Sequence, residues 1–418
     1  MKVLHQRKAR SGMEDVSSSG KSFAFKLLVC LFLAGIAVFF TIQASLGARD
    51  SSIGTAHIPA GDIDAPLNDL LYQSLKDRMG ELASSRTYEL VPTWELEMRG
   101  ETFIAEESGY LYISSTQGQV MALDAVSGAI LWSLDLGVWI SAPPTAKDGV
   151  VYVGATNHVL YALDARSGAL LWYFTSQGEI LTRPLVSDGT VFFTADNNSV
   201  YDLVHRLYAL DARSGALLWI YNTKSWTPSP PAVGADAVYL GGYKREVYAL
   251  QKTTGQELWS FKASSIIFSS PHIVSGKVLF ACIDGWVYAL DAASGAQEWS
   301  RKLPGFVWLA LPDGSGNLYA CSHRNTLTAL AMETGEELWT FSDGDFLSCS
   351  AIAEGKVVCA FNTGGRAYLL DAASGDSLGL LASPYHFTSP PLLRGEYVYG
   401  ASSDGFIRAY ALPADALP

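Results

Sequence analysis

The chain has 418 residues, of which 49% are hydrophobic and 12% are aromatic, and its net charge at pH 7 is −12. This length and apolar content exclude an intrinsically disordered chain. Residues 1–49 hold seven basic and two acidic side chains, which leaves residues 50–418 with a net charge of −17. General electrostatic attraction to nucleic acid or anionic lipid is excluded for this acidic part, so we expect no nucleic-acid partner.

The N-terminal residues predict a membrane anchor. Six basic residues within 1–26 precede an uncharged run over 27–48. As a helix this run would measure about 33 Å, enough to cross a hydrocarbon core of about 30 Å. The basic residues predict a cytoplasmic head over 1–26, a transmembrane signal anchor over 27–48, and all later residues on the periplasmic or extracellular side. A cleaved signal peptide ending near Ser45–Gly47 is the alternative.

Residues 49–93 are predicted to be a connector that contains an amphipathic helix. Asp64 can cap this helix, and Pro66 suits its first turn. One apolar stripe follows, formed by Leu67, Leu70, Leu71, Leu75, Met79 and Leu82. We expect the stripe to pack on the following domain; association with a partner or a second copy is the alternative.

From about residue 94 the chain repeats the pattern Ala-x-Asp-x-x-Ser-Gly-x-x-x-Trp. Full copies begin at Ala122, Ala162, Ala209 and Ala289, and weaker copies lie between and after them. The leucine after the alanine recurs at positions 123, 163, 210, 250, 290, 330, 370 and 412, a period of about 40 residues. A fixed period of this size is typical of a stacked repeat architecture.

Each unit consists of four short apolar runs rich in Val, Tyr, Leu and Trp, separated by Asp-Gly and Ser-Gly turns. Such runs predict strands, and four antiparallel strands per period predict a propeller blade. We therefore expect an all-β fold, an eight-bladed β-propeller over residues 94–418. Trp94 precedes the first unit, and the last unit, ending at Leu412, has only three strands. The strand of Trp94 is predicted to complete the last blade and close the ring.

The spaced tryptophans resemble the docking motif of the PQQ-like repeat family of β-propellers. The positions that match this structural motif are Trp94, Trp132, Trp172, Trp219, Trp259, Trp299 and Trp339, with Gly379 in the remaining unit. At each match we expect a rigid indole between blades, with its N–H directed at a carbonyl. The family includes the propeller subunit of the outer-membrane β-barrel assembly machinery and quinoprotein dehydrogenases, so the resemblance implies a fold more strongly than an activity.

The other tryptophans predict a partner-binding face. Trp139, Trp226 and Trp308 come just before the innermost strand of their units, and Trp286 falls in a turn between the second and third strands. In a propeller these connections emerge at the same end of the ring. Phenylalanines recur at or beside the position just before the innermost strand of a unit, at Phe103, Phe268, Phe346 and Phe387.

Polar and basic residues are expected on the same face. An insertion over 196–205 is predicted to be a solvated loop in a turn of the same kind. The insertion and the equivalent turns contribute Asn197, Tyr201, His205, Arg206, Lys244, Arg245, Arg324 and Arg366. Aromatic and arginine side chains are enriched at interface centres. The alternative is that the rings only plug the mouth of the channel.

Cysteines and acidic residues give weaker signals. Cys282, Cys321, Cys349 and Cys359 allow three full pairings, and free buried thiols are the default expectation. The segment 313–317 resembles a calcium loop but lacks the following glutamate, so we expect an ordinary hairpin turn. No residue is predicted to be catalytic or to bind a metal or cofactor.

Three functions are compatible with this pattern. The favoured one is a non-enzymatic, membrane-anchored scaffold that binds membrane-associated protein partners. The alternative is a PQQ-dependent dehydrogenase that oxidises an alcohol or sugar with bound PQQ and calcium. That chemistry needs ligands and loops that a chain of minimal turns hardly provides, and the vicinal cysteine pair of the alcohol-oxidising enzymes is missing. A sensor ectodomain is a further alternative, although residues 1–26 are too few for an output domain.

Overall fold

A computed structural model of the chain describes residues 87–89 and 91–412, except 200, 201, 228, 314, 315, 323, 324, 343–346, 354, 355, 362–365, 383–386, 389 and 390. The chain divides into two compact units, Met1–Ala56 and His57–Pro418, and every described residue belongs to the second. The predicted head, anchor and amphipathic stripe lie outside the described residues. Within the described ranges, no helix is both long and apolar enough to span a bilayer.

The described strands form eight sheets, and each sheet corresponds to one predicted blade. Blade 1 holds β3 (Thr102–Glu107), β4 (Tyr110–Ser115), β5 (Gln119–Asp124) and β6 (Ile130–Asp135). Blade 2 holds β7 (Thr145–Lys147), β8 (Val150–Gly154), β9 (Val159–Asp164) and β10 (Leu170–Thr175). Blade 3 holds β11 (Leu185–Ser187), β12 (Thr190–Ser199), β13 (Asp202–Asp211) and β14 (Leu217–Asn222). Blade 4 holds β15 (Ala232–Val233), β16 (Ala237–Gly241), β17 (Glu246–Gln251) and β18 (Glu257–Lys262).

The second half of the chain repeats this order. Blade 5 holds β19 (His272–Val274), β20 (Lys277–Ala281), β21 (Trp286–Asp291) and β22 (Gln297–Lys302). Blade 6 holds β23 (Val307–Pro312), β24 (Asn317–Ser322), β25 (Thr326–Ala331) and β26 (Glu337–Phe341). Blade 7 holds β27 (Leu347–Ala353), β28 (Lys356–Phe361), β29 (Arg366–Asp371) and β30 (Ser377–Ala382), with β1 (Thr87–Glu89) as a fifth strand. Blade 8 holds β31 (Leu392–Arg394), β32 (Tyr397–Ala401), β33 (Phe406–Ala411) and β2 (Pro92–Glu97).

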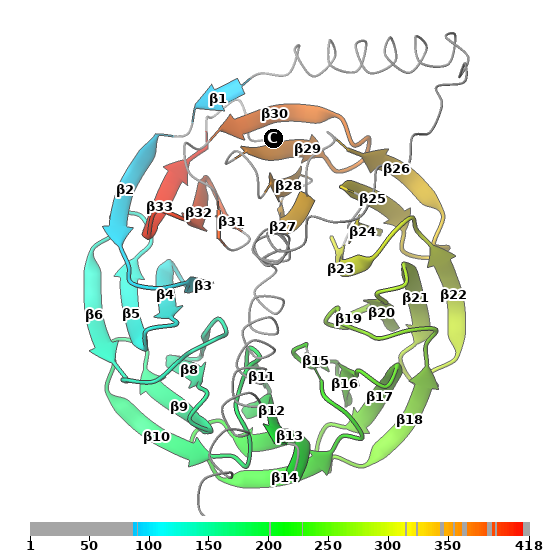
Figure 1. Ribbon diagram of the computed structural model, residues 1–418, viewed down its shortest axis with the longest axis horizontal. Coiled ribbons are helices and arrows are strands. Elements are labelled where there is room, and N and C mark those ends of the chain that lie inside the picture. Colours follow the sequence, from blue (N-terminus) through cyan, green and yellow to red (C-terminus); the bar gives the residue numbers. More distant parts are fainter. Residues whose placement is uncertain are drawn as a thin grey trace, which may run out of the picture. The chain divides into compact units, whose positions relative to one another are not determined.

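The blades form a closed ring (Figure 1). The first strands of consecutive blades contact one another from β3 through β23 and again between β27 and β31. Blades 6 and 7 are in contact through β24 and β27, and β32 contacts β3. The antiparallel pairing of β2 with β33, in which Trp94 lies opposite Ala409, joins the start of the ring to its last blade. The predicted closure is therefore confirmed. Blade cores consist of apolar residues that are fully buried between neighbouring sheets, such as Val151, Leu210 and Phe280.

The docking tryptophans tie each blade to the next. Each indole donates its Nε1–H to a backbone carbonyl of the following repeat, at 2.9–3.1 Å, as from Trp172 to Ala212 and from Trp219 to Lys252. The ring face lies against the glycine of that repeat: a Cβ added to Gly215 would come within 2.6 Å of the Trp172 ring. The docking role predicted for the seven tryptophans is therefore confirmed.

The turn around each docking glycine is built by the aspartate and serine of the repeat. In blade 3 the Asp211 carboxylate accepts the Ser214 N–H at 2.8 Å and its hydroxyl at 2.6 Å. These hydrogen bonds lower the pKa of Asp211. The Gly215 N–H donates to the Asp211 carbonyl at 2.9 Å, and Gly215 adopts a positive φ of 71° that favours glycine. The turn thereby presents a flat backbone surface to the incoming indole.

The interface between blades 7 and 8 is built differently. Gly379 replaces the tryptophan in β30, and β30 instead carries β1 along its outer edge, paired in parallel from Thr87 to Glu89. The chain then continues from β1 into β2 of blade 8. One short segment thus bonds to both blades at the seam that lacks an indole. Among the described residues the first strand, β1, lies before the repeats, and it pairs with β30 although its sequence carries no repeat pattern.

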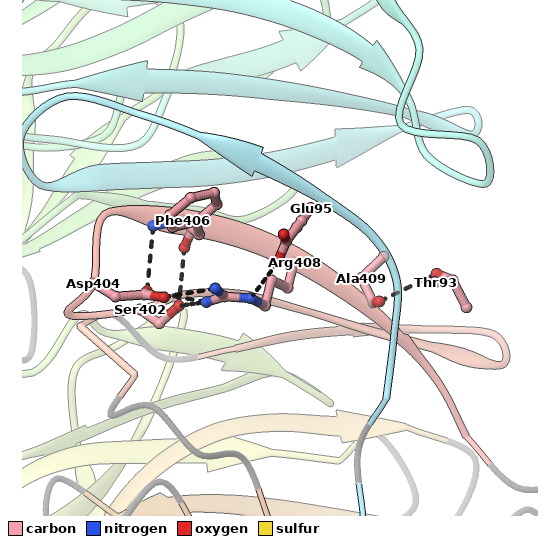
Figure 2. A network of polar contacts seen from close by, with 7 residues as sticks. All are labelled: Thr93, Glu95, Ser402, Asp404, Phe406, Arg408 and Ala409. Carbon is pink, nitrogen blue, oxygen red and sulfur yellow. Dashed lines mark hydrogen bonds and ion pairs between the residues drawn. The ribbon is translucent and has the colours of Figure 1, made fainter.

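A buried arginine reinforces the closure (Figure 2). Arg408 of β33 donates to the Asp404 carboxylate at 2.6 Å, to the Ser402 hydroxyl at 2.6 Å and to Glu95 of β2 at 3.1 Å. Its pKa is raised, chiefly by the bond to Asp404, so the guanidinium stays charged. Thr93 adds a bond from its hydroxyl to the Ala409 carbonyl at 3.1 Å. The first and last segments of the ring are therefore joined by side chains as well as by backbone.

The expectation of free thiols is only partly correct. Cys282 is a buried free thiol, whereas Cys321 is disulfide-bonded. Spacing along the chain could not reveal this bond, because the stacking of blades brings together residues of different repeats. The strand that holds Cys321, β24, contacts β27 of the next blade.

We expect Gly215→Ala to destabilise the protein more than Gly189→Ala. Both glycines have a φ near +70°, but only at Gly215 would the added Cβ meet an indole; at Gly189 it meets no atom within 4 Å. Gly189→Ala is therefore the control, and it should lower the free energy of unfolding by about 1 kcal/mol for the backbone conformation alone. Gly215→Ala should cost about 2 kcal/mol more through overpacking. Urea unfolding followed by tryptophan fluorescence measures both, and equal losses would show that the indole contact contributes little.

Candidate functional site

The connections between blades and the turns between second and third strands lie at one end of the ring, which we call the connection face. Hydrogen bonds join the two kinds of segment within a blade. The Trp139 carbonyl accepts the Thr156 N–H at 3.0 Å, and the Trp226 carbonyl accepts the Tyr243 N–H at 2.9 Å. Residues that are distant in the sequence therefore come together on this face, as the repeat alignment indicates.

Three aromatic rings form a cluster on the connection face. Trp226 precedes β15, Tyr243 lies in the turn between β16 and β17, and Phe268 precedes β19. The Trp226 ring centroid lies 5.9 Å from those of Tyr243 and Phe268, and the last two lie 6.4 Å apart in an edge-on arrangement. Tyr243 is 47% exposed and the other two are half-buried. The cluster is thus a fixed aromatic surface that remains partly open to solvent.

Basic side chains surround this cluster. Lys244 and Arg245 follow Tyr243 in the same turn and are exposed. The turn is held by the bond from the Arg245 N–H to the Gly242 carbonyl at 3.1 Å. Lys224, on the connection before β15, places its Nζ 5.4 Å from the centroid of the Tyr248 ring. Aromatic faces beside cations are a common arrangement for recognition, since the rings supply apolar area and the cations bind carboxylates or carbonyls.

The remaining predicted tryptophans differ in exposure. Trp139 is 40% exposed on the connection before β7. Trp286 is the first residue of β21 rather than part of a turn, and it is half-buried against the core between blades 4 and 5, with the Lys302 Nζ 5.7 Å from its ring centroid. Trp308 lies in β23, and its side chain is outside the described residues. Among the predicted tryptophans whose side chains are described, Trp139 is exposed, and Trp226 and Trp286 are both half-buried.

Of the other predicted residues, some lie at the surface, some lie outside the described residues, and some are buried. Arg366 begins β29 and is exposed, and Arg206 donates from Nε to the Asn222 side chain at 2.8 Å. Tyr201, Arg324 and Phe346, together with the side chain of Asn197, lie outside the described residues. Phe103 and Phe387 are buried, so they belong to the core and not to the face.

The insertion is not a solvated loop. Residues 196–199 extend β12 and residues 202–205 extend β13, and the two extensions pair with each other from Asp196 opposite His205 to Ser199 opposite Asp202. The backbone N–H and carbonyl groups on the other side of Asp196 bond to those of Glu179, each at 3.0 Å. The prediction failed because the inserted residues pair with one another and carry no repeat signature. The hairpin extends blade 3 at the connection face.

A buried hydrogen-bonded pair of titratable side chains lies at the base of this hairpin. His205 Nδ1 and Asp196 Oδ1 are 2.8 Å apart, and the two side chains are 10% and 4% exposed. Burial raises the pKa of the Asp196 carboxyl to about 6, although bonds from His205 and from the Thr227 backbone oppose this shift. His205 is one of the residues predicted on the face, but its hydrogen bond to Asp196 was not predicted. The two residues lie at the two ends of the insertion, and their pairing could have been predicted from these positions.

The described side chains do not suggest a metal centre. Across the described ranges, no three His, Cys, Asp or Glu side chains are grouped so that they could hold a metal ion. Asp313 accepts the Asn317 N–H at 3.0 Å and the Tyr319 hydroxyl at 3.0 Å, which stabilises the turn before β24.

Comparisons with known proteins agree with this architecture. The model of the family described as outer membrane protein assembly factor BamB matches residues 81–174, 146–206 and 204–413. Among solved structures, BamB from Moraxella catarrhalis is 20% identical, with a TM-score of 0.66 over 77% of this chain and 100% of that chain. A search of curated proteins finds no match.

Two further solved structures show how widely this fold is used. The computationally designed protein Ika8 is 18% identical, with a TM-score of 0.68 over 78% of this chain and 99% of its own. The quinohemoprotein alcohol dehydrogenase ADHIIG from Pseudomonas putida HK5 is 15% identical, with a TM-score of 0.61 over 77% of this chain and 76% of its own. At such identities the likeness shows the fold alone.

The pKa of the Asp196 carboxyl is 3.8 in the unfolded chain and about 6 in the folded protein. We therefore expect the stabilising contribution of Asp196 to fall as the pH rises between these two values. In this window the folded state holds the proton more tightly than the unfolded state, so raising the pH favours unfolding. Asp196→Asn cannot titrate. The difference in urea midpoint between wild type and variant should therefore decrease from pH 4 to pH 6.5, and a constant or increasing difference would contradict the assignment.

Proposed function

The chain belongs to the family described as outer membrane protein assembly factor BamB, and from this premise we propose that it is a non-enzymatic scaffold that binds protein partners. The observation that carries the proposal is the aromatic cluster of Trp226, Tyr243 and Phe268 beside the exposed Lys244 and Arg245. These residues come from three separate segments that the ring holds in register. They form a preorganised surface of the composition that is found at interface centres.

The surface is suited to a folded or extended protein segment. Its rings pack against one another, with Phe268 edge-on to both Trp226 and Tyr243, so little side-chain entropy is lost when a partner covers them. Lys244 and Arg245 are exposed cations on a chain whose net charge is −12. They therefore favour acidic or carbonyl-rich partner segments. The hairpin over 196–205 extends blade 3 at the same end and supplies a second contact region.

We further propose that the propeller lies on the extracytoplasmic side of a membrane and is tethered there by residues 27–48. The basic residues before that run support this orientation. The disulfide at Cys321 supports it as well, since disulfides persist in oxidising compartments. The tether would keep the connection face within reach of membrane-associated partners, in keeping with a family described by membrane-protein assembly.

The alternative of a PQQ-dependent dehydrogenase rests on the propeller fold alone. Two of the solved structures that resemble this chain are quinohemoprotein alcohol dehydrogenases, each 15% identical to it. No specific arrangement of described side chains favours that chemistry over binding. We therefore propose that the chain uses neither PQQ nor calcium.

Replacing Trp139 and Trp226 together by alanine should reduce the recovery of partner proteins at least tenfold, since central aromatic residues each contribute about 2 kcal/mol to such interfaces. The measurement is quantitative mass spectrometry of proteins that copurify with the intact, detergent-solubilised chain after cross-linking. Tyr110→Ala is the matched control: Tyr110 is 40% exposed, like Trp139, but it begins β4 at the opposite end of the ring.

The control variant should retain the same partners as the wild type. Circular dichroism and the urea midpoint should be close to those of the wild type for both variants, because none of the replaced side chains is a docking tryptophan. If the double variant keeps its partners, the connection face is not the binding surface. If the control loses them equally, the loss reflects the fold and not the face.

A further inference from the structure

The outer strands of three consecutive blades, β6, β10 and β14, expose apolar side chains to solvent. Each strand has two consecutive apolar residues directly before its docking tryptophan: Ile130–Leu131, Leu170–Leu171 and Leu217–Leu218. All six are exposed. We call the solvent-facing side of these three strands the rim arc; it lies on the circumference of the ring (Figure 1).

A bulge in each outer strand explains why both residues of a pair face outward. In β10, Leu170 lies opposite Leu163 and Trp172 lies opposite Ala162, so Leu171 has no residue opposite it. The same register shift occurs in β6 and β14. Tyr173, after the tryptophan, is 63% exposed. The rim arc therefore exposes apolar area on the order of several hundred Å², at the upper end for a monomeric protein.

The outer strands of the other blades are protected against edge-to-edge pairing. Edge strands expose unpaired backbone groups, and charged residues, proline or a covering segment normally block them. β2 has Pro92 and two glutamates, β18 begins with Glu257 and ends with Lys262, β22 holds Glu298 and two basic residues, and β26 begins with Glu337. β30 is covered by β1.

The rim arc lacks this protection. β10, with the sequence LLWYFT, and β14, with the sequence LLWIYN, contain no charged residue and no proline, and β6 has only Asp135 at its end. β10 is the middle of the three and is paired only with β9 among the described strands. Its second edge therefore combines free backbone groups, exposed leucines and a tyrosine, without any charge to oppose pairing.

From this contrast we propose that β10 pairs with β10 of a second copy of the chain. The two strands run antiparallel about a twofold axis, which joins blade 2 of each copy into one continuous sheet. Leu171 and Tyr173 pack against their counterparts, and the neighbouring apolar pairs of β6 and β14 line the contact. Isologous pairing of this kind is closed, because each copy uses the same strand and leaves no further edge free.

A second copy fits this surface better than a charged partner does. Residues 50–418 carry a net charge of −17, so two copies repel one another wherever acidic residues face each other. The rim arc is the stretch of outer strands where that repulsion is weakest. Its apolar area is of the same order as the roughly 800 Å² per partner that a stable interface buries. The arc is separate from the connection face, so a dimer leaves both connection faces free.

The test is the association state of the intact chain in detergent, measured by sedimentation equilibrium from about 1 to about 100 μM. The wild type should dimerise in this range. Leu171→Lys should weaken the dimer at least tenfold. Leu258→Lys is the matched control: Leu258 holds the same repeat position in β18, and the two leucines are 51% and 50% exposed. The control should dimerise like the wild type.

A second pair of variants locates the contact without depending on affinity. Tyr173→Cys lies near the proposed twofold axis and should form a disulfide between copies under mild oxidation. Ser260→Cys, at the equivalent position of β18, should not. A monomeric wild type overturns the proposal, whether or not the rim arc binds lipid vesicles or another protein. Equal effects of the two lysine variants, or equal cross-linking of the two cysteine variants, overturn it as well.

Discussion

The contact on which the whole structure depends is that of an indole with the glycine turn of the next repeat. A tryptophan in the outer strand of one blade lies flat on backbone that only glycine leaves open, and its N–H bonds to a carbonyl at 2.9–3.1 Å in all seven cases. The contact fixes both the distance and the rotation between blades. Because those values repeat, the connections before the innermost strands converge at one end of the ring, and Trp226, Tyr243 and Phe268 form one surface there.

The seam between blades 7 and 8 shows what a ring needs when that contact is missing. Gly379 cannot dock, and the chain instead bonds β1 to blade 7 and β2 to blade 8. The buried Arg408 then ties β33 to the half-exposed Glu95 through a charge-assisted bond.

Features that depend on a repeat neighbour could be predicted from the sequence, and those that depend on distant pairing could not. Trp172 and Gly215 carry the same signature in successive repeats, so their spacing predicts blades and docking. The closure by Trp94 followed from counting strands. By contrast, the pairing of Thr87 with Leu380, the extension of β12 and β13 through the insertion, and the bond between Asp196 and His205 involve residues outside the repeat pattern. Burial of Phe103 and Phe387 was missed for a related reason, since the direction of a side chain beside a short inner strand is set by its neighbours in the ring.

Closure of the ring is the claim on which the connection face and the proposed scaffold role both rest, and native-state hydrogen exchange tests it most directly. The amides of β2 and β33 should be protected to the same degree as those of central strands such as β5 and β9, because a closed ring opens cooperatively. Rapid exchange of β2 and β33 while β5 and β9 remain protected would show an open array of blades, and it would contradict the account.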